Sequence, residues 1–135
     1  MALKDLENSI ISRLQSQITA VPTEAFPENP KNYALKHPDG VILVSYHGSQ
    51  FEDPSQGNVI FQDQKFEFDI VLIHRHLRNH QGAYDLLDQI RMALTGYQVA
   101  GYTKLYPVRE QFISEENGLW QYGITFAFHG NHREM

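Results

Sequence analysis

Three histidines near the middle of the chain, His74, His76 and His80, are the residues whose types and spacing best suit chemistry. On an extended strand, side chains two positions apart point to the same side, so His74 and His76 would bring two imidazoles together. A catalytic zinc ion takes three protein ligands and a water, and His80 is a candidate third ligand. A small metal-dependent hydrolase built on these histidines is therefore one functional alternative.

Two features of the sequence argue against this metal site. The preceding carboxylates, Glu67 and Asp69, fall on the opposite strand face from His74. The sequence also contains no helical histidine pair of the HExxH type. We favour the simpler interpretation that the histidines are polar residues between the end of a strand and the start of a helix, and we expect no bound metal or cofactor.

Other catalytic signatures are absent from the sequence. No serine lies in a GxSxG elbow, and no GxxxxGK[ST] or GxGxxG loop is present to bind nucleotide phosphates. The chain has no cysteine, which excludes thiolate ligands, cysteine nucleophiles and disulfides. We therefore expect no catalytic residues and a protein that is not an enzyme.

The histidines are preceded by a strand pattern and followed by a helix pattern. Apolar residues first alternate with the two-residue period of a strand, at Phe66, Phe68, Ile70 and Leu72. They then follow helical spacing, at Ala83, Leu86, Leu87, Ile90 and Leu94. Gly96 stands where a left-handed residue would end that helix. An N-terminal helix, ending before Pro22, is predicted to bury five apolar residues: Leu3, Leu6, Ile10, Leu14 and Ile18.

Four other segments have the character of strands. Residues 23–26 lie between prolines and suit a sheet edge, whereas 41–46 is apolar on both faces and suits a central strand. Residues 102–112 and 119–128 form a predicted hairpin around an Asn-Gly turn. The polar stretch 48–57 is the expected tip of a second hairpin, whose return strand begins near Asn58. One face of the last strand is the expected core wall: Trp120, Tyr122, Ile124, Phe126 and Phe128.

These elements predict a single α+β domain over residues 1–135. It would contain a four- to five-stranded, mainly antiparallel sheet with two helices packed on one face. The net charge is −5 and the eleven Lys and Arg residues are scattered, which makes nucleic acid an unlikely partner. No apolar run is long enough to span a membrane and the N-terminus lacks the features of a secretion signal, so we expect a cytoplasmic location.

Three segments together resemble the tail-terminator (tail-completion) proteins of Mu-like phages and prophages. They are EAFPENPKNYALKHPDGVILVSYHGSQF (24–51), RNHQGAYDLLDQIRMALTGY (78–97) and KLYPVREQFISEENGLWQYGITFAF (104–128). The similarity covers nearly the whole chain and lies in the order and spacing of elements rather than in a catalytic signature.

The resemblance implies a structural subunit that forms a homo-oligomeric, hexameric ring at the head-proximal end of a contractile tail. There the ring would cap the tail tube or sheath and contact head-completion proteins. The subunit would be found in the cytoplasm of the bacterial host, and in the virion tail if the prophage is functional.

A ring requires surfaces that grip other copies, and exposed hairpins and sheet edges are natural sources of such contacts. Our candidate surfaces are the polar loop 48–57 and the edge 103–112. The candidate contact residues for a subunit or partner are Phe51, Glu52, Asp53, Lys104 and Tyr106. The alternative is that these are ordinary loop and edge residues of a monomeric binding module for a peptide or nucleic acid.

Overall fold

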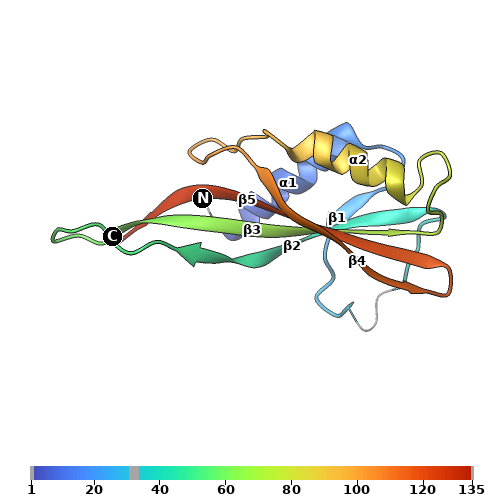
Figure 1. The fold of residues 1–135 in the computed structure, drawn as a ribbon, viewed down its shortest axis with the longest axis horizontal. Helices are drawn as coiled ribbons and strands as arrows, with labels where there is room; N and C mark the ends of the chain where they lie inside the picture. The colour runs from blue at the N-terminus through green and yellow to red at the C-terminus, as the bar shows by residue number, and fades with distance from the viewer. Residues whose placement is uncertain (1, 31–33, 135) are drawn as a thin grey trace.

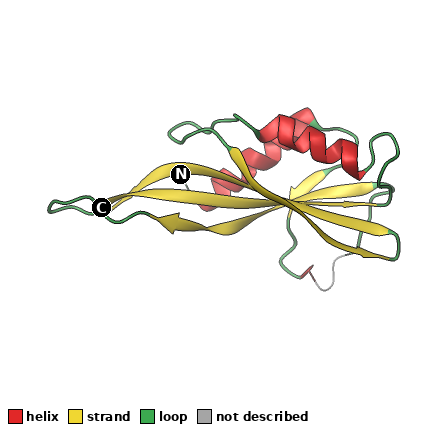
Figure 2. Ribbon diagram, viewed as in Figure 1, coloured by secondary structure: helices red, strands yellow, loops and turns green. Residues whose placement is uncertain are grey.

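A computed structural model describes residues 2–30 and 34–134 and contains two helices and one five-stranded sheet. Helices α1 (Leu3–Gln17) and α2 (Ala83–Leu94) both cover the same face of the sheet (Figure 2). The predicted α+β architecture, with both helices on one face, is confirmed.

The sheet is antiparallel except at one edge. Its strands are β1 (Thr23–Ala25), β2 (Gly40–Phe51), β3 (Phe61–His74), β4 (Tyr106–Glu116) and β5 (Leu119–Arg133). They are arranged in the order β1-β2-β3-β5-β4, and only β1 and β2 run parallel. The short strand at 23–26 and the strand within 103–112 are therefore both edge strands, as predicted.

The core lies between the helices and the apolar faces of β3 and β5. Phe68, Phe126 and Phe128 are fully buried, and the rings of Phe66 and Phe128 stack with centroids 5.1 Å apart. Burying each such side chain is worth roughly 1.5–3 kcal/mol before entropy is subtracted. The predicted core wall on β5 is correct from Ile124 onward, while Trp120 and Tyr122 are only half-buried.

Four of the five apolar residues predicted for the N-terminal helix are buried, three within α1 and Ile18 at its C-cap. Leu6, Ile10, Leu14 and Ile18 are buried, whereas Leu3 is 43% exposed, so the prediction for Leu3 was wrong. Leu3 is the first residue of α1, about one turn before the first residue that packs on the sheet.

The opposite face of the sheet is covered only in part. Residues 26–30 and 34–39, between β1 and β2, lie beneath the sheet in Figure 1, on the side away from the helices. Of these residues, Phe26 and Leu35 pack against a second small cluster formed by Val41, Leu43 and Ile73. This second cluster explains why residues 41–44 are apolar on both sides of their strand.

Three strands continue past the helices and form a projection that we call the arm (Figure 1). The arm consists of the end of β2 from Gly48, residues 52–60, the start of β3 up to Lys65, and the end of β5 from His129. The expected loop 48–57 is therefore shorter at its start, because β2 runs to Phe51, and the return strand begins at Phe61 rather than near Asn58. Both faces of the arm lie beyond the helices, so its strands need no apolar alternation and resemble a loop in sequence.

Two predicted turns have the expected backbone. Gly96 has a φ of 86° just after α2, although its N–H donates to Leu105 O at 2.8 Å instead of capping the helix. Asn117 and Gly118, with φ of 54° and 78°, form the turn between β4 and β5. The first strand of this hairpin begins at Tyr106 rather than at residue 102, and β5 continues to Arg133.

Candidate functional site

The three candidate zinc ligands do not converge. His74 ends β3 and is 2% exposed, and its Nδ1 accepts a hydrogen bond from the His76 N–H at 3.0 Å. The His80 side chain is 90% exposed and lies 3.9 Å from Asp85. Burial lowers the pKa of His74, which fits a neutral ring that accepts this hydrogen bond. In the described ranges 2–30 and 34–134, no three His, Asp or Glu side chains are grouped as a metal site.

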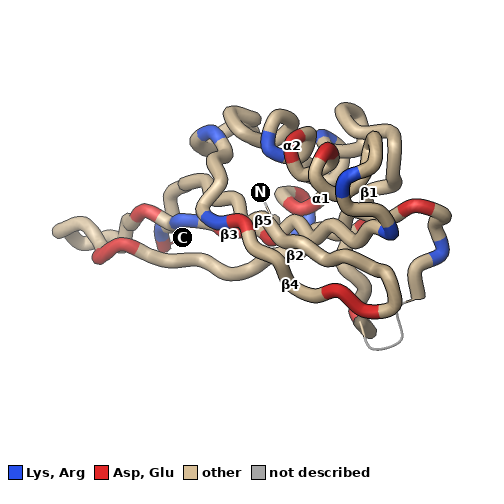
Figure 3. The backbone as a smooth tube through the Cα atoms, turned by 45° about the vertical axis from the view of Figure 1, so that its right-hand side comes forward, with Lys and Arg blue, Asp and Glu red and all other residues tan. Residues whose placement is uncertain are grey.

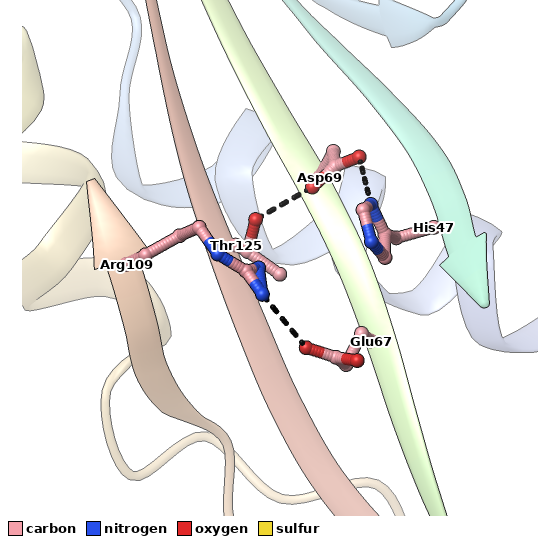
Figure 4. A network of polar contacts seen from close by, with 5 residues as sticks. All are labelled: His47, Glu67, Asp69, Arg109 and Thr125. Atoms are coloured by element: carbon pink, nitrogen blue, oxygen red, sulfur yellow. Dashed lines mark hydrogen bonds and ion pairs between the residues drawn. The ribbon is translucent and has the colours of Figure 1, made fainter. Parts of the chain in front are cut away.

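A polar network lies on the sheet face away from the helices (Figure 4). Thr125 on β5 donates its hydroxyl hydrogen bond to Asp69 Oδ1 at 2.7 Å, and His47 Nδ1 lies 2.8 Å from Asp69 Oδ2. Arg109 extends from β4 and places Nη2 3.6 Å from Glu67 Oε1 on β3. The network thus joins β2, β3, β5 and β4 along a groove of about 280 Å³.

The arrangement in this groove does not prepare a nucleophile. A hydroxyl is activated when a histidine accepts its proton and a carboxylate orients that histidine. Here Thr125 and His47 both bind the same carboxylate, so the hydroxyl and the imidazole do not bond to each other. The Glu67 side chain is only 6% exposed, and its Oε1 has no hydrogen-bond partner.

A second polar chain crosses the sheet at the base of the arm. Tyr106 OH lies 2.9 Å from His129 Nε2, and His129 Nδ1 lies 2.7 Å from Asp63 Oδ2. The Tyr106 ring also stacks on the His129 ring, with centroids 6.0 Å apart. Tyr106, a predicted partner contact, is 38% exposed, but its hydroxyl and its ring already contact His129 of the same chain. Its neighbour Lys104 is exposed.

The tip of the arm carries an apolar cluster. Phe51 is 52% exposed and packs edge-on against His132, and the acidic residues Glu52 and Asp53 follow it at the surface. Three more apolar residues are exposed beside them: Val59 (56%), Ile60 (43%) and Phe61 (41%). We define these four side chains, Phe51, Val59, Ile60 and Phe61, as the tip cluster. Phe51 contacts His132 whereas Phe61 pairs with Arg133, the next residue of β5, so the tip cluster is spread over both faces of the arm. Sequence reasoning found Phe51 alone, although the run Val-Ile-Phe after a polar loop was an available signal.

The predicted contact residues form two separate groups. Phe51 pairs with Gln64, at the outer end of β3, and the residues of 51–53 belong to the arm tip. Tyr106 pairs with Ala127, which in turn pairs with Glu67 further along β3. The structure therefore places one group at the tip and the other at the base of the arm, on opposite sides of the sheet order.

Comparison with known families identifies the chain. Residues 10–131 match the model of a family described as Gp37 protein. The chain belongs to the Gp37 protein family. This family is phage-associated, and membership supports a structural role in a phage for this Gp37-family chain. No curated protein matches the chain.

Two surface properties accompany this assignment. Among residues 2–30 and 34–134 of this Gp37-family chain, the Lys and Arg positions are dispersed along the backbone (Figure 3). Across residues 2–30 and 34–134, neither helix is long and apolar enough to cross a membrane.

Proposed function

We propose that this Gp37-family chain is the subunit of a tail-terminator ring. In this role, copies of the chain assemble into a hexamer that caps the tail tube or sheath and offers a surface to head-completion proteins. The observation that carries the proposal is the tip cluster, which projects beyond the helices on an arm built from three strands (Figure 1).

Exposed apolar side chains at the end of a projecting arm favour a protein partner. Single exposed apolar residues are common, but four large ones at the end of one projection, bordered by polar residues, favour an interaction site. The tip cluster has such a rim, because Glu52 and Asp53 follow directly after Phe51. The tip is thus suited to bury against another protein while its charged rim stays in water.

The backbone holds the tip in one shape before any partner binds. Glu52 N donates to Asp63 O at 2.9 Å, and Ser55 N donates to Phe61 O at 2.8 Å. Ile60 N donates to Glu134 Oε1 at 2.7 Å, which ties the C-terminal strand to the same place. A pre-organised surface loses less conformational entropy on binding, so these bonds favour a docking role for the arm.

The charge of the chain favours protein over nucleic acid as the partner. A net charge of −5 with dispersed cations gives little attraction for phosphates. The groove around Glu67 and Asp69 contains no nucleophile activated by a base. A structural role therefore accounts for the available surfaces better than a hydrolase does.

The test is the length of tails made by the phage or prophage that encodes the chain. A cap that stops tube growth predicts overlong, irregular tails when the gene is deleted, as measured by negative-stain microscopy. Wild-type chain supplied in trans should restore uniform tails, and the variant Phe51→Ser with Val59→Ser should not. Met92→Ser, at an 80% exposed position on α2, is the matched control and should restore them. Tails of normal length in the deletion strain would overturn the proposal.

A further inference from the structure

We propose that neighbouring subunits join by pairing the edge of β4 in one copy with the free outer edge of β2 in the next. The β2 segment concerned is 45–51, beyond the residues that β1 covers. This inference rests on the ring proposed above and specifies which surfaces close it.

The β2 edge is half occupied within its own chain. β1 pairs only with Ile42, Leu43 and Val44, whereas β2 continues its pairing with β3 as far as Phe51. On the occupied part, Ile42 N donates to Pro22 O at 2.9 Å and Val44 O accepts from Phe26 N at 2.8 Å. Backbone groups of alternate residues face the same side of a strand, so Tyr46 continues this row beyond β1.

The β4 edge is the complementary surface. β4 is the last strand of the sheet order, and its pairing is with β5. Its residues are almost all exposed, including Val108 at 37% and Phe112 at 53%. An open edge presents a row of backbone donors and acceptors that another strand can satisfy.

The polarity of the strands permits a head-to-tail arrangement. β4 is antiparallel to β5, β5 to β3 and β3 to β2, so β4 and β2 run in opposite directions on opposite sides of one sheet. When the next copy is related by rotation about an axis to which the strands are tilted, as in a barrel, its β2 edge therefore meets β4 antiparallel and displaced along the strand. Repetition of this unlike-edge contact closes a ring.

The position of β1 adds an offset to this contact. The incoming strand can follow β2 only up to residue 45, because β1 occupies the edge beyond it. Across the sheet, Gly48 pairs with Glu67, Glu67 with Ala127 and Ala127 with Tyr106, so Tyr106 lies level with Gly48. From Tyr106, β4 runs toward the level of residues 42–44, the part of β2 that β1 covers. Neighbouring copies must therefore shift along the strand direction, and closed sheets contain such a stagger.

The charges on the two edges favour pairing of β4 with β2 over pairing of β4 with a second β4. β4 carries three acidic residues, Glu110, Glu115 and Glu116, and one basic residue, Arg109. Two β4 edges paired across a two-fold axis between Phe112 and Ile113 would place Glu110 of one copy opposite Glu115 of the other, which is unfavourable. Segment 45–51 of β2, SYHGSQF, contains no Lys, Arg, Asp or Glu. A second copy's β2 is therefore a better partner for β4 than a second β4.

Engineered disulfides test this pairing in the full-length chain, which has no cysteine of its own. Gln50→Cys on β2 and Gln111→Cys on β4 are exposed and lie on the sheet face away from the helices. Ser114→Cys, further along β4, tests a different alignment of β4 against the neighbouring β2. Met92→Cys, on exposed α2, is the matched control for random collision. Oxidation is performed under conditions where the ring is seen by native mass spectrometry or, if it requires a template, on tail tubes.

The expected result is a cross-linked dimer from Gln50→Cys mixed with Gln111→Cys or Ser114→Cys, and none when either β4 variant is mixed with Met92→Cys. A double variant carries Gln50→Cys together with whichever β4 cysteine forms the cross-link. It should give a series of covalent oligomers, the largest of which contains as many subunits as the ring. A ring that forms without these cross-links overturns the edge pairing alone. Self-cross-linking of Gln111→Cys as the main product also overturns it, in favour of a two-fold contact. A chain that stays monomeric both alone and on tail tubes overturns the ring together with the pairing.

Discussion

Arg109 reaches across β5 to place its guanidinium 3.6 Å from Glu67 Oε1, an oxygen that is buried without a hydrogen bond. The two residues come from β4 and β3, which do not pair with each other. At 3.6 Å the contact is an ion pair and too long for a hydrogen bond. Arg109 therefore places its positive charge beside a carboxylate oxygen that has no hydrogen-bond donor among residues 2–30 and 34–134.

Replacing Arg109 by Ala should destabilise the fold by removing this compensation. A buried charge that loses its partner can cost several kcal/mol, but Arg109 is itself 43% exposed, so we expect a loss on the order of 1–2 kcal/mol. Urea denaturation measures the free energy of unfolding. Glu67→Gln in the same chain should restore part of the loss, because the amide needs no cation. Equal stability of Arg109→Ala and wild type would contradict this role.

Gly130 should tolerate a methyl group poorly because of an aromatic neighbour. A Cβ there would lie 2.6 Å from Tyr102 Cδ1, and the Tyr102 ring is packed edge-on against Phe66 and Phe128. Overpacking of this kind costs about 1–3 kcal/mol, so we expect Gly130→Ala to lose that much stability.

The matched control for this change is Gly123→Ala on the same strand. Its Cβ would meet only Ile113 Cδ1 at 3.1 Å, the end of a side chain that is 45% exposed and free to turn away. Thermal denaturation of both variants gives the comparison. The packing argument fails if Gly123→Ala is the more damaging change.

Stability should decrease when the pH is lowered through the range in which His74 titrates in the unfolded chain. Burial lowers the pKa of His74 in the fold, and the His76 carbonyl oxygen, 3.1 Å from His74 Nδ1, has a smaller opposing effect on that pKa. Below a pH of about 6.5 the unfolded chain therefore binds a proton that the folded chain does not. The loss begins near the unfolded pKa on acidification and ends below the lower pKa of the folded state.

His74→Asn isolates this contribution, because the Asn side chain can still accept the His76 N–H without titrating. The free energy of unfolding is measured between pH 7.5 and 5.5 for both proteins. Wild type should lose more stability over this range than the variant does. A variant with the same pH dependence as wild type would show that His74 is not the titrating group.

Changes at the tip cluster should separate stability from function. Phe51 and Val59 are the most exposed members, at 52% and 56%. Substitutions at exposed positions usually change stability by no more than about 0.5 kcal/mol each, so Phe51→Ser with Val59→Ser should unfold close to wild type. The same variant should lose association with tail tubes in a co-sedimentation assay. A large drop in melting temperature would show that the cluster serves the fold instead.

The helix-facing core was predictable because its signal is local. Phe66, Phe68 and Ile70 alternate within five residues, and the same period reveals both the strand and the face that it buries. The arm was not predictable in the same way. Gly48, Ser49 and Gln50 form a strand whose two faces lie beyond the helices, so no apolar alternation distinguishes them from a loop.

The polar network on the sheet face could not be predicted from the sequence, for a different reason. Glu67 and Arg109 are brought together by the order β3-β5-β4, in which the strand that is last in the chain lies between the other two. No spacing in the sequence reports that order. The zinc alternative fails for a related reason, since β3 ends at His74 and His76 no longer follows the strand alternation.

The central claim is that this chain caps a tail as a ring, and imaging it on tails is the most direct test. Purified chain would be added to tail tubes from a phage strain that lacks the gene, and the ends of the tubes would be examined by negative-stain microscopy. The account predicts a ring of subunits at one end of each tube. Tubes that remain bare, or that bind the chain along their sides, would contradict it.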